Sequence, residues 1–465
     1  MKEGWEMISE YNENSKIYSA ENLICALRLE KKRLISQKKI GQQKTIPALS
    51  KKEIPFKIPD NWCWIRLNEI SIIQEGPGIR KSQYKNEGVQ FLTVTNILNG
   101  SIDLEKSKKY ISVEEYKSKY RHFRINKGDI VSSCSGATWG KTAIFTLDCK
   151  IILNTSTLRL RFYGDLGENK FLYYLTKADF FKSQLSKHLT GQQPNYGYYH
   201  YSLIAVPIPP LTEQQNIVSI LDEAFTAIDQ AKENLQRNLQ NAKDLFQSEL
   251  NSVFSKRGDG WVEKRLGELG TITSSKRIYK SEYVPDGIPF YRTKEIKELS
   301  NGKAITLELF ISKGRYNEIR KDFGVPKVGD LLISAVGTIG EILVIQDTNE
   351  FYFKDGNILW LKDFKTLDTN FLKYALIAFV EVIKSLSIGS AYNALTIEKL
   401  IEYRVSVPNS MISQQQIVHQ LDSLSAETKK LESLYQQKLN SLEELKKSIL
   451  QKAFSGELTE KHIII

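Results

Sequence analysis

The sequence lacks any long apolar run, and this absence argues against a membrane-spanning protein. No stretch approaches the roughly 18 consecutive apolar residues that a transmembrane helix needs. The first residues, MKEGWEMISEYNENSK, also lack the basic-then-apolar layout of a signal peptide. We therefore expect a cytoplasmic protein.

Cysteine and histidine are scarce. Only four cysteines and five histidines occur in 465 residues. None of them falls in a CxxC or mixed Cys/His spacing typical of a metal site. Disulfide bonds and structural zinc are therefore not expected.

The composition is that of a folded protein with a basic balance. Hydrophobic residues make up 41% and charged residues 26% of the chain, which is typical of a soluble globular protein. A length of 465 residues exceeds what one core needs, so two or more domains are expected. The net charge of +11 is a mild argument for a polyanionic partner.

The strongest signal is an internal repeat with a period of about 200 residues. Trp62 precedes Trp261 by 199 residues, and Phe91 precedes Phe290 by the same 199. KGDIVSSC, from position 127, matches VGDLLISA, from position 328, and EQQNIVSILD, from 213, matches QQQIVHQLD, from 414. Each half is therefore one globular unit followed by one helical unit.

The globular units are predicted to be mixed and mostly β. Runs rich in Val, Ile, Phe and Thr predict strands at 91–97, 129–133 and 142–147. Helical spacing of apolar residues predicts helices at 171–185 and 371–386, and an amphipathic helix at 21–39 that stands outside the repeat.

A long helix is predicted after the prolines that close each globular unit, with Thr212 or Ser413 able to cap it. At ~1.5 Å per residue, about 40 residues form a rod of about 60 Å, which can bury an apolar stripe only against another rod. Antiparallel packing of the two rods would relate the units by a pseudo-twofold axis. The predicted packing residues are Leu221, Phe225, Ile228, Leu235, Leu239, Phe246, Leu424, Leu431, Tyr435, Leu442, Leu445 and Ile449.

The predicted fold class is α+β, with two tandem-repeat, mixed and mostly β domains separated by two long antiparallel coiled-coil helices. The expected boundaries are an N-terminal helical segment and connector at 1–54, a first domain at 55–210, a central helical spacer at 211–257, a second domain at 258–408 and a C-terminal helical spacer at 409–465.

Three strings in the sequence resemble enzyme motifs but depart from the pattern that each chemistry needs. SGATWGKT, at 135–142, misses the phosphate-loop spacing, and its counterpart in the second half has Glu341 in place of Lys141. Asp286, Glu295 and Lys297 spell a loose PD-(D/E)xK nuclease string, but the first half has Asn96 and Leu98 at the equivalents of the last two. IPPL, at 208–211, lacks the polar first and aromatic last residue of a base-methyltransferase loop. No catalytic residue is predicted.

The chain resembles the specificity subunits of type I restriction-modification systems over nearly its whole length. The resemblance is carried by WCWIRLNEI with WVEKRLGEL, by the KGDI and VGDLL strands, and by GQQPN, PIPPLTEQQNIV and the terminal LKKSILQKAFSGELTE. One departure is SIGSAYNALTIEKL, from position 387, which stands where the first half has LTGQQPNYGYYHYSL.

The resemblance implies two target recognition domains, each reading one half of a split, asymmetric DNA site, with the helices setting the gap between the halves. It implies partners of two kinds: two methyltransferase subunits that use S-adenosylmethionine, and two restriction or translocase subunits that use ATP and magnesium. None of these cofactors is expected on this chain, and no membrane partner is expected.

Residues able to contact DNA are those with side chains that can bond base edges or phosphates and that fall in predicted loops. The candidates in the first domain are Arg80, Lys81, Tyr84, Thr93, Thr95, Asn96, Ser135, Thr138, Lys141, Gln192, Gln193, Asn195 and Tyr196. The candidates in the second domain are Lys276, Arg277, Tyr279, Arg292, Thr293, Lys294, Thr338, Tyr392 and Asn393.

Two alternative functions stay open at this point. A coiled-coil scaffold whose globular units bind proteins would have the same heptads and basic charge, and weak salt dependence of duplex binding would indicate it. A stand-alone nuclease using Glu295 and Lys297 would show magnesium-dependent cleavage by the isolated chain.

Overall fold

The computed structural model describes residues 19–42, 44–188, 194–255, 260–386 and 395–460, with side chains of 382–386 and 460 set aside. The chain divides into two compact units: unit 1 comprises residues 1–233 and 439–465, and unit 2 comprises residues 234–438. Among the described residues, no helix is long and apolar enough to cross a membrane.

Unit 1 combines short strands and helices with one half of each long helix. Its helices are α2 (Ala20–Ser36), α3 (Leu67–Ile70), α4 (Val113–Glu115), α5 (Asn169–Lys177), α6 (Asp179–Ser186), α7 (Tyr198–Ser202), the start of α8 (Leu211–Ser255), the end of α14 (Met411–Ser455) and α15 (Glu457–Glu460). Its strands are β1 (Cys63–Arg66), β2 (Ser71–Glu75), β3 (Val89–Phe91), β4 (Tyr110–Ile111), β5 (Ile130–Ser133), β6 (Thr142–Ile144), β7 (Ile151–Ile152), β8 (Thr157–Phe162) and β9 (Ala205–Ile208). Short 3-10 turns cover Lys51–Glu53, Lys81–Gln83, Leu104–Lys106, Arg121–Phe123 and Gly136–Thr138, and a π-helix covers Tyr116–Tyr120.

Unit 2 has a similar set of helices and strands. Its helices are the end of α8, α9 (Leu266–Leu269), α10 (Thr293–Ser300), α11 (Lys313–Asp322), α12 (Thr369–Leu386), α13 (Ile397–Glu402) and the start of α14, with a 3-10 turn at Lys280–Glu282. Its strands are β10 (Trp261–Arg265), β11 (Thr271–Ser274), β12 (Tyr283–Val284), β13 (Ile288–Tyr291), β14 (Phe310–Ile311), β15 (Leu331–Ser334), β16 (Ile342–Val344), β17 (Tyr352–Phe353), β18 (Ile358–Lys362) and β19 (Arg404–Pro408).

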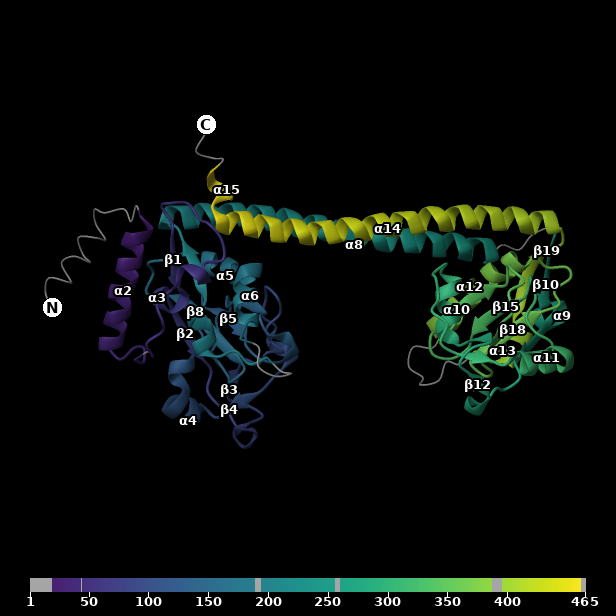
Figure 1. The fold of residues 1–465 in the computed structure, drawn as a ribbon, viewed down its shortest axis with the longest axis horizontal. Helices are drawn as coiled ribbons and strands as arrows, with labels where there is room; N and C mark the ends of the chain where they lie inside the picture. Colours follow the sequence, from purple (N-terminus) through teal and green to yellow (C-terminus); the bar gives the residue numbers. More distant parts are fainter. Residues whose placement is uncertain (1–18, 43, 189–193, 256–259, 387–394, 461–465) are drawn as a thin grey trace. The chain divides into compact units, whose positions relative to one another are not determined.

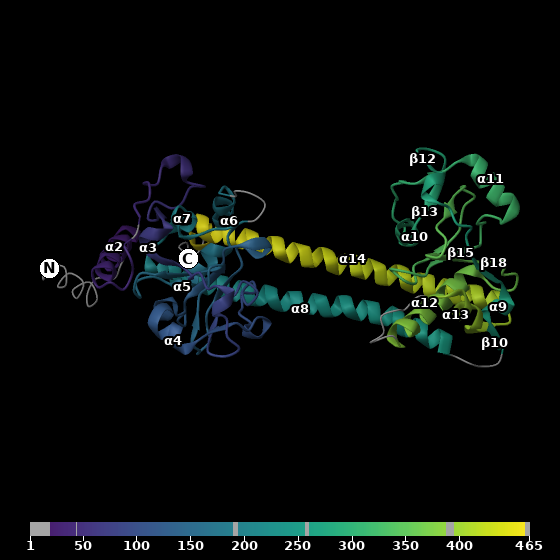
Figure 2. The same ribbon diagram turned by 90° about the horizontal axis from the view of Figure 1, so that it is seen from below.

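The sheets confirm the repeat, with one additional strand, β12, in unit 2. Unit 1 has the orders β1-β9, β2-β8-β5-β6 and β4-β3-β7, and unit 2 has β10-β19, β11-β18-β15-β16 and β12-β14-β13-β17. The central strands β5 and β15, IVSS and LLIS, are buried along their whole length, as apolar runs flanked on both sides should be. In Figure 2, β12 and β13 lie with α10 and α11, whereas β15 and β18 lie nearer α12 and α13.

The closest sequence match in the repeat is a helix-docking motif. Gln214, fully buried in the first turn of α8, donates to the Pro209 carbonyl at 3.0 Å and accepts from the Glu168 amide at 3.1 Å. Gln414 makes the equivalent bonds in unit 2, to the Pro408 carbonyl at 3.0 Å and from the Asp368 amide at 2.8 Å. Buried amides satisfied in this way fix the direction in which each helix leaves its domain.

Two further pairs repeat the anchoring about two turns later. The Tyr174 hydroxyl donates to Asp222 Oδ1 at 2.5 Å, and the Tyr374 hydroxyl donates to Asp422 Oδ1 at 2.5 Å. Burial and the neighbouring carboxylate raise the pKa of both tyrosines.

The long helices run antiparallel within each unit. In unit 1, Asp229 pairs with Lys446 at 3.0 Å and Lys232 with Glu443 at 2.5 Å, so that rising numbers on α8 meet falling numbers on α14 (Figures 1 and 2). In unit 2, Gln420 donates to Glu249 at 3.2 Å. Each unit therefore holds the beginning of one long helix and the end of the other.

A buried or half-buried phenylalanine ends each long helix in a globular core. Phe454, at the end of α14, is fully buried in unit 1, with ring centroids 5.4 Å from Phe171 and 5.8 Å from Phe180. Phe254, at the end of α8, lies 5.2 Å from Phe371 in unit 2. The predicted fold class, two repeated domains of mixed helix and sheet with long antiparallel helices, is confirmed.

Several predicted element bounds are wrong. The strand predicted at 91–97 ends at Phe91, because Asn96 closes a turn back to Thr93 at 3.0 Å. The helix predicted at 171–185 is broken at Ala178, whose ψ of 143° is extended. The long helices begin at Leu211 and Met411, so Thr212 and Ser413 lie inside the first turn and are not N-caps.

Two of the predicted packing residues are also wrong. Leu431 and Leu445 are 37% and 47% exposed. The less exposed positions of α14 include 421, 428, 435, 442 and 449, and the position four residues after each of them is also buried or half-buried. Glu432 and Lys446 therefore lie on the buried stripe of α14, whereas a leucine-based pattern selects the position before each of them. The other ten predicted packing residues are buried or half-buried.

Candidate nucleic-acid interface

A pinned loop follows the central strand in both units. In unit 1, Ser133 Oγ, at the end of β5, donates to the Thr138 carbonyl and accepts from the Lys141 amide at 3.2 Å. In unit 2, Ser334 Oγ donates to the Thr338 carbonyl at 2.5 Å and accepts from the Glu341 amide at 2.9 Å. The two loops are pinned in the same way, although the loop of unit 1 is one residue longer, and their side chains differ.

In unit 1, this loop lies against the segment that carries Asn195. Ser135 and Asn195 form an isolated antiparallel bridge, and the Gly136 amide donates to the Pro194 carbonyl at 3.0 Å. Ser135, Thr138 and Lys141 are partly exposed and Asn195 is exposed. The structure thus brings four predicted residues, from two distant parts of the sequence, onto adjacent loops.

A second loop of unit 1 carries Arg80 and Lys81. Both are exposed, and the loop is held by the Thr155 hydroxyl, which donates to the Pro77 carbonyl at 3.0 Å. Tyr84, at the end of this loop, packs against Phe91 with ring centroids 5.2 Å apart. Arg80 and Lys81 stay candidates for DNA contact, while the Tyr84 ring serves at least partly to hold the loop.

Unit 2 gathers its candidates around a depression of about 600 Å³. Thr293, Lys294 and Thr338, all predicted, line it. Sequence reasoning missed five other polar residues that line it, one of them acidic: Lys297, Glu298, Asn301, Lys303 and Asn357. Positions 294, 297 and 301 recur at helical spacing along α10 and its C-cap, and this signal could have identified Lys297 and Asn301.

The loop before β12 adjoins this depression. The Lys276 amide donates to the Tyr352 hydroxyl at 2.6 Å, and Arg277 Nε donates to Asp355 Oδ2 at 2.8 Å. Asp355 lies two residues before Asn357 of the depression. Tyr279, 63% exposed, presents its ring to solvent from the same loop.

The prediction that Thr93 and Asn96 contact DNA is wrong in this structure. Asn96 is fully buried: Oδ1 accepts from the Thr93 amide at 2.9 Å and from the Thr93 hydroxyl at 2.7 Å. Its Nδ2 donates to the carbonyls of Asp103 and Ser107 at 2.9 and 3.0 Å. No bonding capacity is left for a base edge, so the pair is a turn-stabilising element. Thr95, between them, is exposed and stays a candidate.

Tyr196 and Arg292 are also corrected. Tyr196 is 1% exposed and packs against Trp139 at 4.9 Å, and burial raises the pKa of its hydroxyl. Arg292 bonds the buried Glu295 at 2.7 Å and Glu308 at 2.8 Å, so its guanidinium is already occupied. The prediction that these two contact DNA is therefore withdrawn. Gln192, Gln193, Tyr392 and Asn393 lie outside the described residues.

Glu308 forms ion pairs with two residues that were predicted to contact DNA. Lys294 and Arg292 both bond it, at 2.7 and 2.8 Å, and these bonds lower the pKa of the Glu308 carboxyl to about 2. Lys294 is nevertheless exposed at the depression, so it can exchange this surface partner for a phosphate at small cost.

The nuclease string is a structural element. Glu295 is 2% exposed, and its carboxylate accepts from the Arg292 amide at 2.7 Å as part of the start of α10. Lys297 lies on the exposed side of the same helix, 3.8 Å from Glu341. Over the residues that the structure describes, no three His, Cys, Asp or Glu side chains form a cluster that could hold a metal ion.

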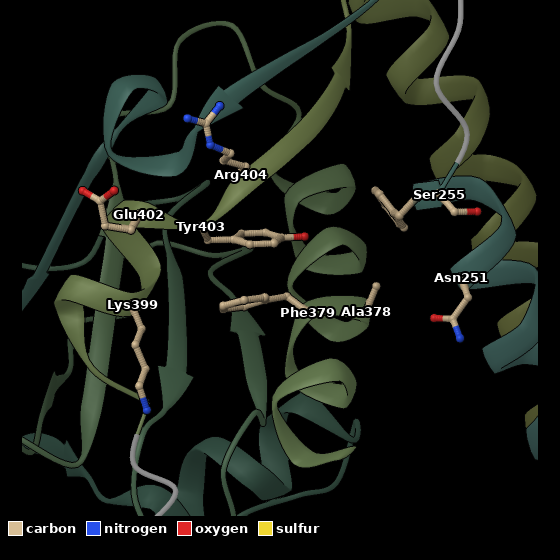
Figure 3. A pocket seen from close by; sticks show the side chains of 9 residues that line it. Asn251, Ser255, Ala378, Phe379, Lys399, Glu402, Tyr403 and Arg404 are labelled. Carbon is tan, nitrogen blue, oxygen red and sulfur yellow. The ribbon is translucent and has the colours of Figure 1, made fainter. Parts of the chain in front are cut away.

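A further depression of unit 2, about 830 Å³, has a different character (Figure 3). The stacked rings of Phe379 and Tyr403, 3.8 Å apart, form its wall together with Ala378. Asn251 and Phe254 of α8 border it. The rings and Ala378 give this depression an apolar wall, and the charged side chains of Lys399, Glu402 and Arg404 also line it.

Comparison with known proteins agrees with the fold. The family described as "Type I restriction modification DNA specificity domain" matches residues 59–240 and again residues 258–444. A protein of Haemophilus influenzae named for a type I restriction enzyme specificity subunit is 30% identical over 277 residues, which cover 56% of this chain and 65% of that one. The EcoAI specificity subunit of Escherichia coli is 26% identical over 242 residues, 50% of this chain and 40% of its own length. The first relatives are thus matched over less than two thirds of their length.

Proteins that match nearly the full length of the chain have a lower sequence identity to it. The EcoKI specificity subunit of Escherichia coli K12 is 25% identical over 451 residues, covering 87% of this chain and 90% of that one. A chain from a structure of a type I R-M system has a TM-score of 0.70 at 22% identity, covering 86% of this chain and 100% of that chain. The HsdS subunit from Thermoanaerobacter tengcongensis has a TM-score of 0.53 at 22% identity, covering 87% and 99%.

Since the family matches both halves in the positions that the repeat predicts, the chain belongs to the type I restriction-modification DNA specificity family.

Proposed function

We propose that this chain is the non-catalytic DNA-recognition subunit of a type I restriction-modification complex, in which each unit reads one half of a split, asymmetric duplex site. The observation that carries the proposal is the pinned loop. Ser133 and Ser334 hold equivalent loops after equivalent strands, yet the loops present Lys141 in one unit and Glu341 in the other. One scaffold with different side chains is what the reading of two different sequences requires.

The remaining parts of the proposal follow from family membership. The partners are duplex DNA, two methyltransferase subunits and two restriction or translocase subunits, in the cytoplasm. S-adenosylmethionine, ATP and magnesium are bound by those partners. The five segments given above are proposed as functional domains, with the spacer helices setting the distance between the half-sites.

A selection experiment tests the proposal. The full chain is incubated with duplexes of random sequence, and the bound fraction is sequenced. We expect two short, unequal blocks separated by a fixed gap, and binding that falls steeply with salt because phosphate contacts release counterions. Bound sequences without a consensus, together with salt-insensitive binding, would instead support the protein scaffold.

Reciprocal variants assign the blocks to the units. Lys303→Ala with Thr338→Ala removes two side chains that line the depression of unit 2, and Ser135→Ala with Lys141→Ala changes the pinned loop of unit 1. We expect each pair to relax one block only, with a loss of discrimination of roughly 10-fold, because a good side-chain contact to a base contributes about 1–3 kcal/mol. Relaxation of both blocks by either pair would contradict the assignment.

A further inference from the structure

The N-terminal segment that stands outside the repeat forms a groove on unit 1. We call it the N-terminal groove; it has a volume of about 610 Å³ and is lined by Lys38, Lys39 and Lys44 of this segment and by Arg159, His122 and Tyr199 of the rest of unit 1. The segment is firmly attached to the unit. Leu23, Ile24, Leu27 and Leu34 of α2 are buried in the core of unit 1, and Figure 1 shows α2 beside α3.

Polar contacts fix the two ends of this segment. Arg28 bonds Glu69, and Lys31 Nζ donates to the Asn68 carbonyl at 2.7 Å. Further along, the buried Arg66 bonds Glu53 at 2.7 Å, and this bond lowers the pKa of the Glu53 carboxyl to about 2. The stretch between these anchors is therefore held over β2 and β8, whose residues line the groove.

Lys38 has an unusual backbone conformation. Its φ is +55°, in the left-handed region that favours glycine. It ends α2 in a Schellman motif, with the Lys38 amide donating to Ile35 at 3.0 Å and the Lys39 amide donating to Leu34 at 2.9 Å. Because glycine fits this backbone conformation best, a lysine here indicates that its charged side chain has a role outside the fold of the turn.

The groove has a strong excess of unpaired positive charge. Lys38, Lys39 and Lys44 are exposed and make no ion pair or side-chain hydrogen bond within the part of the chain that the structure describes. Glu75 is the carboxylate among the lining residues, and its Oε1 already accepts from the Tyr198 amide. Three free ammonium groups beside an exposed tyrosine ring match a phosphodiester backbone.

The groove adjoins both candidate loops of unit 1. Gln74 and Glu75, which line it, end β2 directly before the loop of Arg80. Tyr198, which also lines it, begins α7 three residues after Asn195. A duplex in contact with these loops would pass the groove when it continues beyond them.

We propose that the N-terminal groove binds the phosphate backbone of duplex DNA that flanks the half-site read by unit 1. This inference rests on the proposed function. The positions 200 residues after this stretch lie within α8, so the repeat supplies no second copy. The two ends of the bound DNA are therefore held differently: the flank beside unit 1 has additional, sequence-independent contacts.

The test uses the full chain and two labelled duplexes that carry the selected sequence, one with a long flank beside the first block and one cut back to its edge. For Lys38→Gly/Lys39→Ala/Lys44→Ala, we expect affinity for the long duplex to fall on the order of 100-fold at about 0.1 M salt. The slope of log K against log salt should become less steep by about 2–3, one for each lost phosphate contact. The consensus and the affinity for the short duplex should stay the same.

Two controls separate this effect from loss of fold or of bulk charge. Lys38→Gly alone places glycine at a positive φ, so thermal stability should be kept or raised while the salt slope becomes less steep by about 1. Lys51→Ala/Lys52→Ala removes two exposed lysines of the same segment outside the groove and should leave the slope unchanged.

The outcomes distinguish the two proposals. An unchanged slope for the triple variant overturns the N-terminal groove as a DNA site while the consensus still stands. Loss of co-purification with a methyltransferase partner, with DNA binding intact, would identify the groove as a protein-binding site and would also overturn it. Absence of any consensus for the unaltered chain would remove the proposed function itself.

Discussion

Replacing Phe454 with alanine is expected to lower the free energy of unfolding of unit 1 by about 3–5 kcal/mol, the usual cost of a large cavity in an aromatic core. Phe454 is fully buried against Phe171 and Phe180, although it lies more than 270 residues from either along the chain. Loss of its ring should therefore release the end of α14 and weaken unit 1 while unit 2 is spared.

Hydrogen exchange followed by mass spectrometry can measure this effect unit by unit. Peptides from β5 and β8 should exchange faster in Phe454→Ala, whereas peptides from β15 and β18 should not change. Leu445→Ala is the matched control, since Leu445 lies on the same helix but is 47% exposed and should cost less than about 0.5 kcal/mol. Equal effects of the two substitutions, or equal loss of protection in both units, would contradict the docking described here.

Replacing Asp129 with asparagine is expected to cost unit 1 about 3 kcal/mol, because it leaves the largely buried Arg159 without its counter-charge and Arg161 with only the exposed Asp165. Asp129 is 1% exposed and lies 3.4 Å from Arg159 and 3.3 Å from Arg161. It also accepts from the Asn126 amide at 2.7 Å, which closes the turn before β5. Chemical denaturation should show a lower midpoint for the transition of unit 1.

Asp330, its counterpart in unit 2, provides the control. The Asp330 carboxylate closes the same turn by accepting from the Lys327 amide at 2.9 Å. Its second partner is the neutral indole of Trp360, which donates at 2.8 Å, where Asp129 has two arginines. Burial raises the pKa of Asp330, so ionisation opposes folding above that pKa and the contribution of this carboxyl improves as pH falls through it. Asp330→Asn removes this cost at neutral pH and should therefore destabilise unit 2 less than Asp129→Asn destabilises unit 1. The reverse order would show that the arginines are not the cause.

The repeat could be predicted from the sequence because its matched residues have structural tasks that both halves share. KGD and VGD match since Asp129 and Asp330 close the same turn. Gln214 and Gln414 match since each buried amide joins a helix to its domain. Because these structural tasks accept only one residue type, the same residues recur at the same spacing in both halves. The fold class could be predicted from that recurrence.

The contact residues were harder to predict because the same side chains serve turns and base edges. Asn96 has the amide that a base reader needs, yet it uses all of it inside a turn. Leu431 and Leu445 fit a leucine pattern, but they are exposed, and the half-buried positions of α14 are the next residues, Glu432 and Lys446. Burial depends on partners distant in sequence, and no local pattern reports it.

The most direct test of the account is to purify this chain with a methyltransferase partner, supply S-adenosylmethionine and duplex DNA, and sequence the positions that become methylated. We predict one split motif of two short, unequal blocks around a gap of fixed length. Methylation at a continuous motif, or at none while the complex is intact, would contradict the reading of one half-site by each unit.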